Sequence, residues 1–98
     1  MPITNIKEKK RGKRLNNADS KLLYSRLCER ATFEFMPERW QEILEQLAIG
    51  VKFREIAKDR GTSMQAIQGQ RVKAINFLGY PLYKNGLTIR ELFAQLFK

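Results

Sequence analysis

The sequence has no histidine and only one cysteine, Cys28, among its 98 residues. A single cysteine forms no disulfide within the chain, and without a histidine there is no imidazole base to activate it as a nucleophile. The usual cysteine and histidine ligands of a zinc site are missing for the same reason. We therefore expect no enzymatic activity, no metal ion and no cofactor, and we interpret Cys28 as a small buried hydrophobic residue.

Long hydrophobic segments are also absent. No stretch approaches the roughly 20 apolar residues of a transmembrane helix, and the basic N-terminus lacks the apolar segment of a secretory signal. We expect a cytoplasmic protein with no membrane partner. Hydrophobic residues make up 43% and charged residues 30% of the chain, a balance typical of a soluble globular domain. The length allows one compact domain with a tail.

Acidic residues are few: the chain has 10 Asp and Glu residues and 19 Lys and Arg residues, which gives a net charge of +9. Residues 1–17 carry six basic and one acidic side chain. Residues 18–59 carry seven basic and eight acidic side chains, and residues 60–98 carry six basic and one acidic side chain. Two positive regions thus flank a neutral one. This clustering predicts a polyanionic partner, because phosphates neutralised by Lys and Arg release counterions. The charge fits DNA and RNA equally, and a tail that only keeps the protein soluble gives the same pattern.

Residues 1–18 show almost no apolar periodicity, and their composition predicts a flexible basic arm. We expect this arm to hold nucleic-acid phosphates without reading sequence, because clustered cations attract the phosphate backbone of any duplex. The arm residues assigned to this role are Lys10, Arg11, Lys13 and Arg14.

From residue 19 onward, apolar residues recur at helical spacing. A first helix is predicted over about 20–31, after the N-cap candidates Asp19 and Ser20. A second is predicted over about 37–49, and Gly50 stands where a helix stop belongs.

Three more helices and a turn complete the predicted domain. A short helix from Phe53 should end before Gly61, and a long one should begin at its N-cap, Ser63, and run to about residue 78. A turn or short hairpin that reverses at Asn85-Gly86 precedes a helix over 88–97, which opens with a capping box. No segment alternates as a strand does, so we predict an all-α domain of four to five helices. The predicted division is 1–18 for the arm, 19–79 for the main domain and 80–98 for the C-terminal turn and helix.

The segment from residue 53 to residue 78 has the spacing of a helix-turn-helix. Two helices that cross around a short turn need a small residue at their contact, a turn residue free to take positive φ, and an apolar anchor on the second helix. Three residues meet these needs and a fourth adds a core contact: Ala57, Gly61, Ile67 and Ile56. Such a spacing also arises by chance in all-α chains, so a helical module without DNA binding is the alternative.

In this interpretation the helix that begins at Ser63 is the recognition helix, and its outer face has no carboxylate. Glutamine pairs with adenine in the major groove, Lys and Arg reach phosphate or guanine, apolar groups touch thymine methyls, and a glycine lets the backbone approach DNA. The candidate DNA-contact residues on this helix are Ser63, Met64, Gln65, Gln68, Gly69, Arg71, Val72, Lys73 and Asn76.

A longer pattern surrounds this motif, made of Pro37 to Leu44, Gln46 to Gly50, Arg54 to Ala57, Ile67, Arg71, Ala74-Ile75 and Leu78-Gly79. It resembles the four-helix DNA-binding unit of LuxR-type regulators and region four of bacterial sigma factors. The resemblance implies that the helix at 37–49 supports the motif and that the Ser63 helix enters the major groove of double-stranded DNA. It also implies transcription control by a small stand-alone bacterial, phage or plasmid regulator.

Three positions depart from that family. Arg60 and Thr62 flank the turn glycine, where the family usually has apolar residues, and Lys52 stands where it usually has a small polar cap. We therefore expect a turn that is looser or differently packed.

Two other functions fit the sequence. A sigma-like adaptor would contact RNA polymerase or another regulator through a protein surface. An RNA-binding protein would use the basic arm and stack bases on Tyr80 and Tyr83, although tyrosines at such positions more often pack on a core.

The C-terminal helix carries four large apolar residues that need a cover: Leu92, Phe93, Leu96 and Phe97. A lone helix-turn-helix reads few base pairs, and two copies place their recognition helices about one DNA turn apart. We therefore expect a homodimer with this helix as its interface, and docking onto the helix at 20–31 of the same chain is the alternative.

Overall fold

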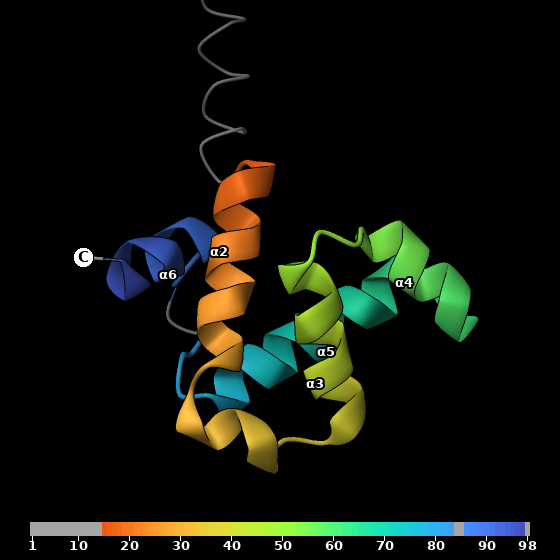
Figure 1. Cartoon of the computed structure of the whole chain (residues 1–98), viewed down its shortest axis with the longest axis horizontal. Coiled ribbons are helices and arrows are strands. Elements are labelled where there is room, and N and C mark those ends of the chain that lie inside the picture. Colours follow the sequence, from red (N-terminus) through yellow and green to blue (C-terminus); the bar gives the residue numbers. More distant parts are fainter. Residues whose placement is uncertain (1–14, 84–85, 98) are drawn as a thin grey trace, which may run out of the picture.

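The computed structural model describes residues 15–83 and 86–97, most of which are helical (Figure 1). The elements in chain order are α2 (Asn17–Cys28), the 3₁₀-helix η1 (Ala31–Phe35), α3 (Glu38–Ala48), α4 (Phe53–Arg60), α5 (Met64–Phe77) and α6 (Ile89–Leu96). Within the described ranges the only β-type pairing is an isolated bridge between Leu82 and Leu87. The prediction of an all-α domain is confirmed. No helix in this part of the chain is long and apolar enough to cross a membrane.

Helix α2 begins earlier than the sequence analysis predicted. Its N-cap is Asn16, whose Oδ1 accepts a hydrogen bond from the backbone N–H of Asp19 at 2.8 Å. Asp19 and Ser20 are therefore not caps, and the boundary of the arm at residue 18 is wrong because residues 17 and 18 are helical. Asp19 instead lies in the first turn, where a carboxylate complements the helix dipole.

The same helix ends at Cys28, three residues before the predicted end, and the chain continues into η1. The proposed phosphate contacts of the arm, Lys10, Arg11, Lys13 and Arg14, lie outside the described residues.

The boundaries of α3, α4 and α5 agree closely with the prediction. Gly50 and Gly61 follow α3 and α4 at φ +97° and +64°, in the left-handed region that costs glycine little. Helix α5 is capped by Ser63, whose hydroxyl accepts from the backbone N–H of Ala66 at 3.1 Å. These helix starts and stops depend on local chemistry, which explains why the sequence predicted them.

One hydrophobic core joins the five α-helices of the described residues. Among the described residues, the largest fully buried side chains are Leu23, Leu27, Ile43, Leu44, Ile56, Ile67, Ile75, Leu82 and Leu92. Cys28 is half-buried against this core, and burial, with smaller contributions from Glu45 and Glu29, raises the pKa of its thiol to about 11. The thiol is therefore protonated and unreactive at neutral pH, and the prediction of a buried Cys28 holds in part.

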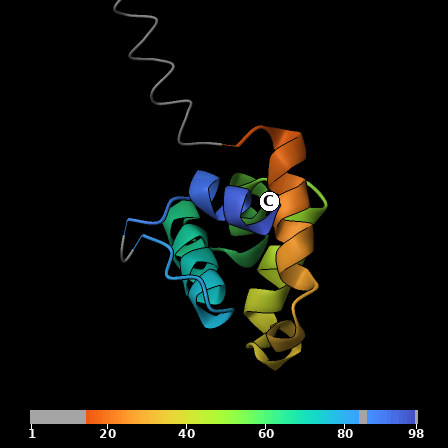
Figure 2. The ribbon, with the colours of Figure 1, turned by 90° about the vertical axis from the view of Figure 1, so that its left-hand side faces the viewer.

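Helix α6 lies beside α2, on the side away from α4 (Figures 1 and 2). Its predicted capping box is present: the Thr88 hydroxyl accepts from the Glu91 N–H at 3.2 Å, and a Glu91 carboxylate oxygen accepts from the Thr88 N–H at 2.9 Å. Leu92 is fully buried, and Phe93 and Leu96 pack against the core.

Helix α6 thus docks within the chain, which was the alternative interpretation of its apolar residues, and the homodimer stays a prediction. Phe97, the fourth apolar residue, is only partly exposed, and the guanidinium carbon of Arg26 lies 4.8 Å from its ring centroid. The apolar side chains of α6 already have a cover, which α2 and the common core supply.

The predicted turn before α6 is described only in part, because Asn85 lies outside the described residues. Gly86 has φ +79°, and Tyr83 also has a positive φ of 66°. The backbone N–H of Tyr83 donates to the carbonyl of Leu87 at 2.7 Å. This bond and the Leu82–Leu87 bridge bring the two sides of the turn together.

Candidate nucleic-acid interface

Three residues, Gly61 to Ser63, join α4 to α5. The backbone N–H of Thr62 donates to the carbonyl of Ala57 at 2.9 Å, and that of Gly61 donates to the carbonyl of Lys58 at 3.2 Å. With Gly61 left-handed, these two bonds form a Schellman motif, which satisfies the last carbonyls of a helix. The chain therefore leaves α4 in a fixed direction, as a helix-turn-helix requires.

The contact between α4 and α5 is built as the spacing predicted. Ala57 is 4% exposed, and Ile56 and Ile67 are fully buried in the shared core. A small side chain at Ala57 lets the two helices approach closely, and Ile67 anchors α5 from the other side of the turn. All three side chains are thus buried where the spacing placed them.

Two of the three departures from the family pattern, Lys52 and Arg60, are accommodated by polar contacts. Lys52 is the N-cap of α4 without a side-chain cap, and the carboxylate of Glu55 accepts from its backbone N–H at 3.3 Å. Arg60 donates to a carboxylate oxygen of Glu42 at 2.9 Å and so ties the end of α4 to α3. Thr62 is exposed. The turn is thus closed by hydrogen bonds, and the expected looseness is not observed.

The first half of α5 presents its candidate residues to solvent. Met64 is 41% exposed, Gln65 and Gly69 are exposed, and Gln68 is partly exposed. A Cβ added to Gly69 would meet no atom within 4 Å among the described residues. The fold itself therefore gives no reason for a glycine at this position, and α5 contains no acidic residue that would repel a phosphate.

The second half of α5 is largely engaged within the protein. The side-chain Oδ1 of Asn76 accepts from the backbone N–H of Leu82 at 2.9 Å, and Val72 packs against the core. Phe77 meets Trp40 edge to face, with ring centroids 6.3 Å apart. The prediction that Asn76 and Val72 project freely outward is wrong, and Lys73 is the exposed candidate in this half.

Arg71 also points inward rather than toward a nucleic acid. Its Nη1 donates to the Tyr24 hydroxyl at 3.1 Å, and its guanidinium carbon lies 5.2 Å from the centroid of the Phe53 ring. Its Nε is buried and has no hydrogen-bond partner within the described part of the chain. The structure thus engages Arg71 with Tyr24 and Phe53, and its contact with phosphate or guanine stays a prediction.

Sequence reasoning did not single out Tyr24 as a functional residue. It lies on the apolar stripe of α2 and is 5% exposed. A buried tyrosine hydroxyl needs a hydrogen-bond partner, so its position on the stripe was the one available signal. The partner, 47 residues away on another helix, follows only from the fold.

The two tyrosines considered for RNA stacking differ in their surroundings. The Tyr80 hydroxyl accepts from Arg30 Nη1 at 2.7 Å, and the Arg30 guanidinium carbon lies 4.9 Å from the centroid of the ring. One face of Tyr80 is therefore covered by the protein. Tyr83 is 52% exposed and is free to stack.

No protein-family model, curated protein or solved structure matches this chain. The likeness to LuxR-type regulators and to sigma region four stays a prediction, carried by the residues of the motif. The structural evidence for a function is the geometry of α4, the turn and α5.

Proposed function

We propose that this chain is a sequence-specific DNA-binding protein that regulates transcription by placing the first half of α5 in the major groove. The observation that carries the proposal is the α4–turn–α5 unit, with Ala57 buried at the contact, Gly61 left-handed, and an exposed first half of α5 without a carboxylate. An α-helix fits the major groove, and a helix-turn-helix presents the N-terminal residues of its second helix there.

The exposed side chains supply the chemistry of base recognition. Gln65 and Gln68 carry amides that can donate to N7 and accept from N6 of adenine in a bidentate pair. Met64 supplies an apolar contact for a thymine methyl group. Gly69 permits close approach of the helix backbone to the base edges, because no side chain stands between them.

Phosphate contacts would come from cations without acidic partners. Arg54 and Lys73 are exposed and form no ion pair within the described residues. From the sequence, we expect the basic side chains of residues 1–14 to supply further phosphate contacts. Such contacts position a protein on the duplex and make its affinity depend on salt, while base contacts provide specificity.

Selection of bound duplexes from a random pool, followed by affinity measurements at several salt concentrations, tests the proposal. We expect a consensus sequence to be enriched and the logarithm of the affinity to fall linearly with the logarithm of the salt concentration. Failure to enrich any sequence would contradict the proposal. Tighter binding to single-stranded RNA would favour the RNA-binding alternative, and binding to RNA polymerase without any nucleic-acid binding would favour the adaptor.

A further inference from the structure

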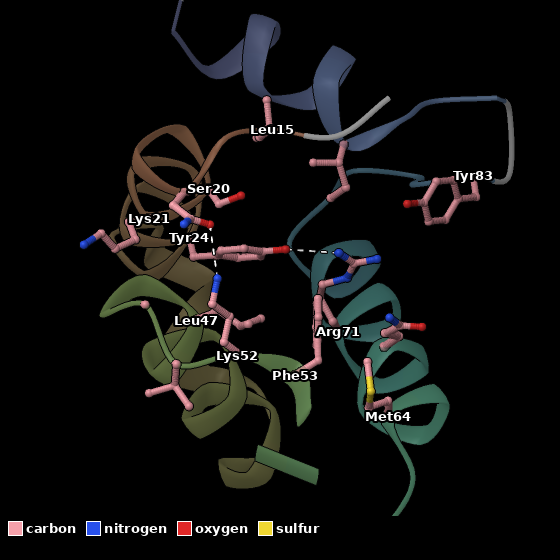
Figure 3. A pocket seen from close by; sticks show the side chains of 15 residues that line it. Leu15, Ser20, Lys21, Tyr24, Leu47, Lys52, Phe53, Met64, Arg71 and Tyr83 are labelled. Atoms are coloured by element: carbon pink, nitrogen blue, oxygen red, sulfur yellow. Dashed lines mark hydrogen bonds between the residues drawn. The ribbon is translucent and has the colours of Figure 1, made fainter. Parts of the chain in front are cut away.

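A cavity of about 620 Å³ opens between the first half of α2, the link from α3 to α4, and the start of α5 (Figure 3). Its volume is within the usual range for small-molecule sites. Most of its lining lies outside the candidate DNA-contact residues of the first half of α5.

The charge of the cavity lining is of one sign. Lys21, Lys52 and Arg71 line it, and none of the described lining residues is acidic. The Lys52 ammonium has a neutral partner, the side-chain oxygen of Asn17 at 3.4 Å, and Arg71 bonds to the neutral Tyr24 hydroxyl. Three cationic residues thus line the cavity, and none of the described lining residues supplies a carboxylate to balance them.

Of these cations, the Arg71 guanidinium has the greatest need of an anionic partner. Burying a charge is costly unless hydrogen bonds and an opposite charge accompany it. Here the protein supplies one hydroxyl acceptor and the face of the Phe53 ring, and the buried Nε has no acceptor among the described residues. An oxyanion in the cavity would neutralise the charge, and a small rotation of the side chain would let it bridge two guanidinium nitrogens.

The rest of the lining is apolar. Leu47 and Ile89 are buried core residues that border the cavity, and Val51 and Phe53 are partly buried beside it. These side chains would cover the hydrocarbon part of a ligand, while the cations would hold its charged end. This division between a few polar groups and an apolar wall is typical of small-molecule sites.

We propose that this cavity binds a small organic anion with an apolar body, with its oxyanion between Arg71 and Lys52 and its body against Phe53 and Leu47. The site includes residues of α2, of the N-terminus of α4 and of α5, so a bound ligand would connect the helix-turn-helix to α2. Control of DNA binding by the ligand rests on the proposed function, whereas binding of the anion does not.

Fluorescence titration with 1-anilinonaphthalene-8-sulfonate, an aromatic anion, tests the site on the full chain without DNA. N-phenyl-1-naphthylamine has the same apolar body without the charge and serves as the matched neutral probe. We expect one bound sulfonate per chain and an affinity for the neutral probe lower by about tenfold, because the ion pair and its hydrogen bonds are lost. Equal affinity for the two probes would overturn the proposal.

Two double variants with the same change in net charge separate the site from the overall field. Lys21→Gln with Lys52→Gln should weaken the sulfonate by about tenfold. Arg39→Gln with Lys58→Gln, exposed residues outside the lining, should leave the affinity within about twofold, because exposed distant charges are screened by salt. Equal weakening in both double variants would overturn the proposal. Near-ultraviolet circular dichroism checks that each variant keeps its tertiary packing.

Arg71→Lys tests the guanidinium while keeping the charge, and we expect a weaker sulfonate affinity because the bidentate contact is lost. An unchanged affinity would overturn the assigned position of the oxyanion. Displacement of the sulfonate by any duplex, regardless of sequence, would assign the cavity to the DNA backbone and overturn a small-molecule site. If the chain binds the sulfonate as expected but binds no DNA, the anion site is supported and the proposed function is contradicted.

Discussion

The two halves of α5 differ in what their side chains do, although they belong to one continuous helix. Over residues 64–69, Gln65 and Gly69 are exposed, Gln68 is partly exposed, and the glutamine side chains form no hydrogen bond within the described residues. Over residues 70–77, Asn76 holds the following turn, and Arg71 reaches across to α2. The comparison indicates that a partner of this helix would meet its first half, while the second half fixes the position of the helix.

The largest effect should come from disturbing the contact under α5. Ala57→Glu would place a carboxylate without a partner between α4 and α5, at a cost of about 3–5 kcal/mol in the free energy of unfolding. Both halves of α5 should lose their positions together. Thermal unfolding followed by circular dichroism measures this. Lys58→Glu is the exposed neighbouring control and should change stability little, and an unchanged melting temperature for Ala57→Glu would mean that the two helices do not pack here.

The next effect tests the first half of α5 alone. Gln68→Ala should weaken binding to the selected duplex by about 1–3 kcal/mol and leave non-specific binding almost unchanged, because a base contact is lost. Stability should stay within about 0.5 kcal/mol of the wild type, since Gln68 makes no buried contact that the fold needs. Gln95→Ala, on the exposed face of α6, is the matched control. Equal weakening on all duplexes would contradict a base-reading role.

The second half of α5 should respond in the opposite way. Asn76→Ala removes the acceptor of the Leu82 N–H and should lower the free energy of unfolding by about 1–2 kcal/mol. Asn76→Asp keeps an oxygen acceptor at that position and should be closer to the wild type. Chemical denaturation measures both. A loss of sequence preference in Asn76→Ala without a loss of stability would reverse the assignment of the two halves.

The smallest effect should separate folding from binding at one position. Gly69→Ala should raise the free energy of unfolding by about 0.5–1 kcal/mol, because alanine is the better helix former and the added methyl group meets open space. The same methyl group should weaken DNA binding, since it would stand where the backbone approaches the bases. If the variant were less stable than the wild type, Gly69 would have a structural role that the packing does not show.

The sequence was most informative where one turn of chain decides the outcome. The Ser63 cap, the left-handed Gly61 and the reciprocal bonds of Thr88 and Glu91 all join residues within three positions of each other, or depend on a single φ. The start of α2 could not be predicted from local capping chemistry alone. Asn16 and Asp19 are both good capping residues on propensity, and the helix begins at the earlier one.

The candidate site was less predictable because its residues meet only after folding. Helical periodicity correctly placed Ile67 inside and Gln65 outside. It assigned Asn76 to the outer face, and Arg71 was expected to reach phosphate or guanine. Their partners in the structure, the N–H of Leu82 and the hydroxyl of Tyr24, belong to other segments. The apolar residues of α6 were recognised as needing a cover, and only the tertiary arrangement shows that α2 and the core provide it.

The packing of α6 against α2 also bears on how the protein folds during translation. Because α2 is the first of the described helices to be synthesised and α6 the last, the face of α2 that meets α6 has no partner until α6 leaves the ribosome. The helix-turn-helix between them can close earlier, since its contacts are local and short loops close at low entropic cost. A released chain that ends before residue 88 should therefore hold a formed α4–α5 pair while α2 still exposes apolar surface.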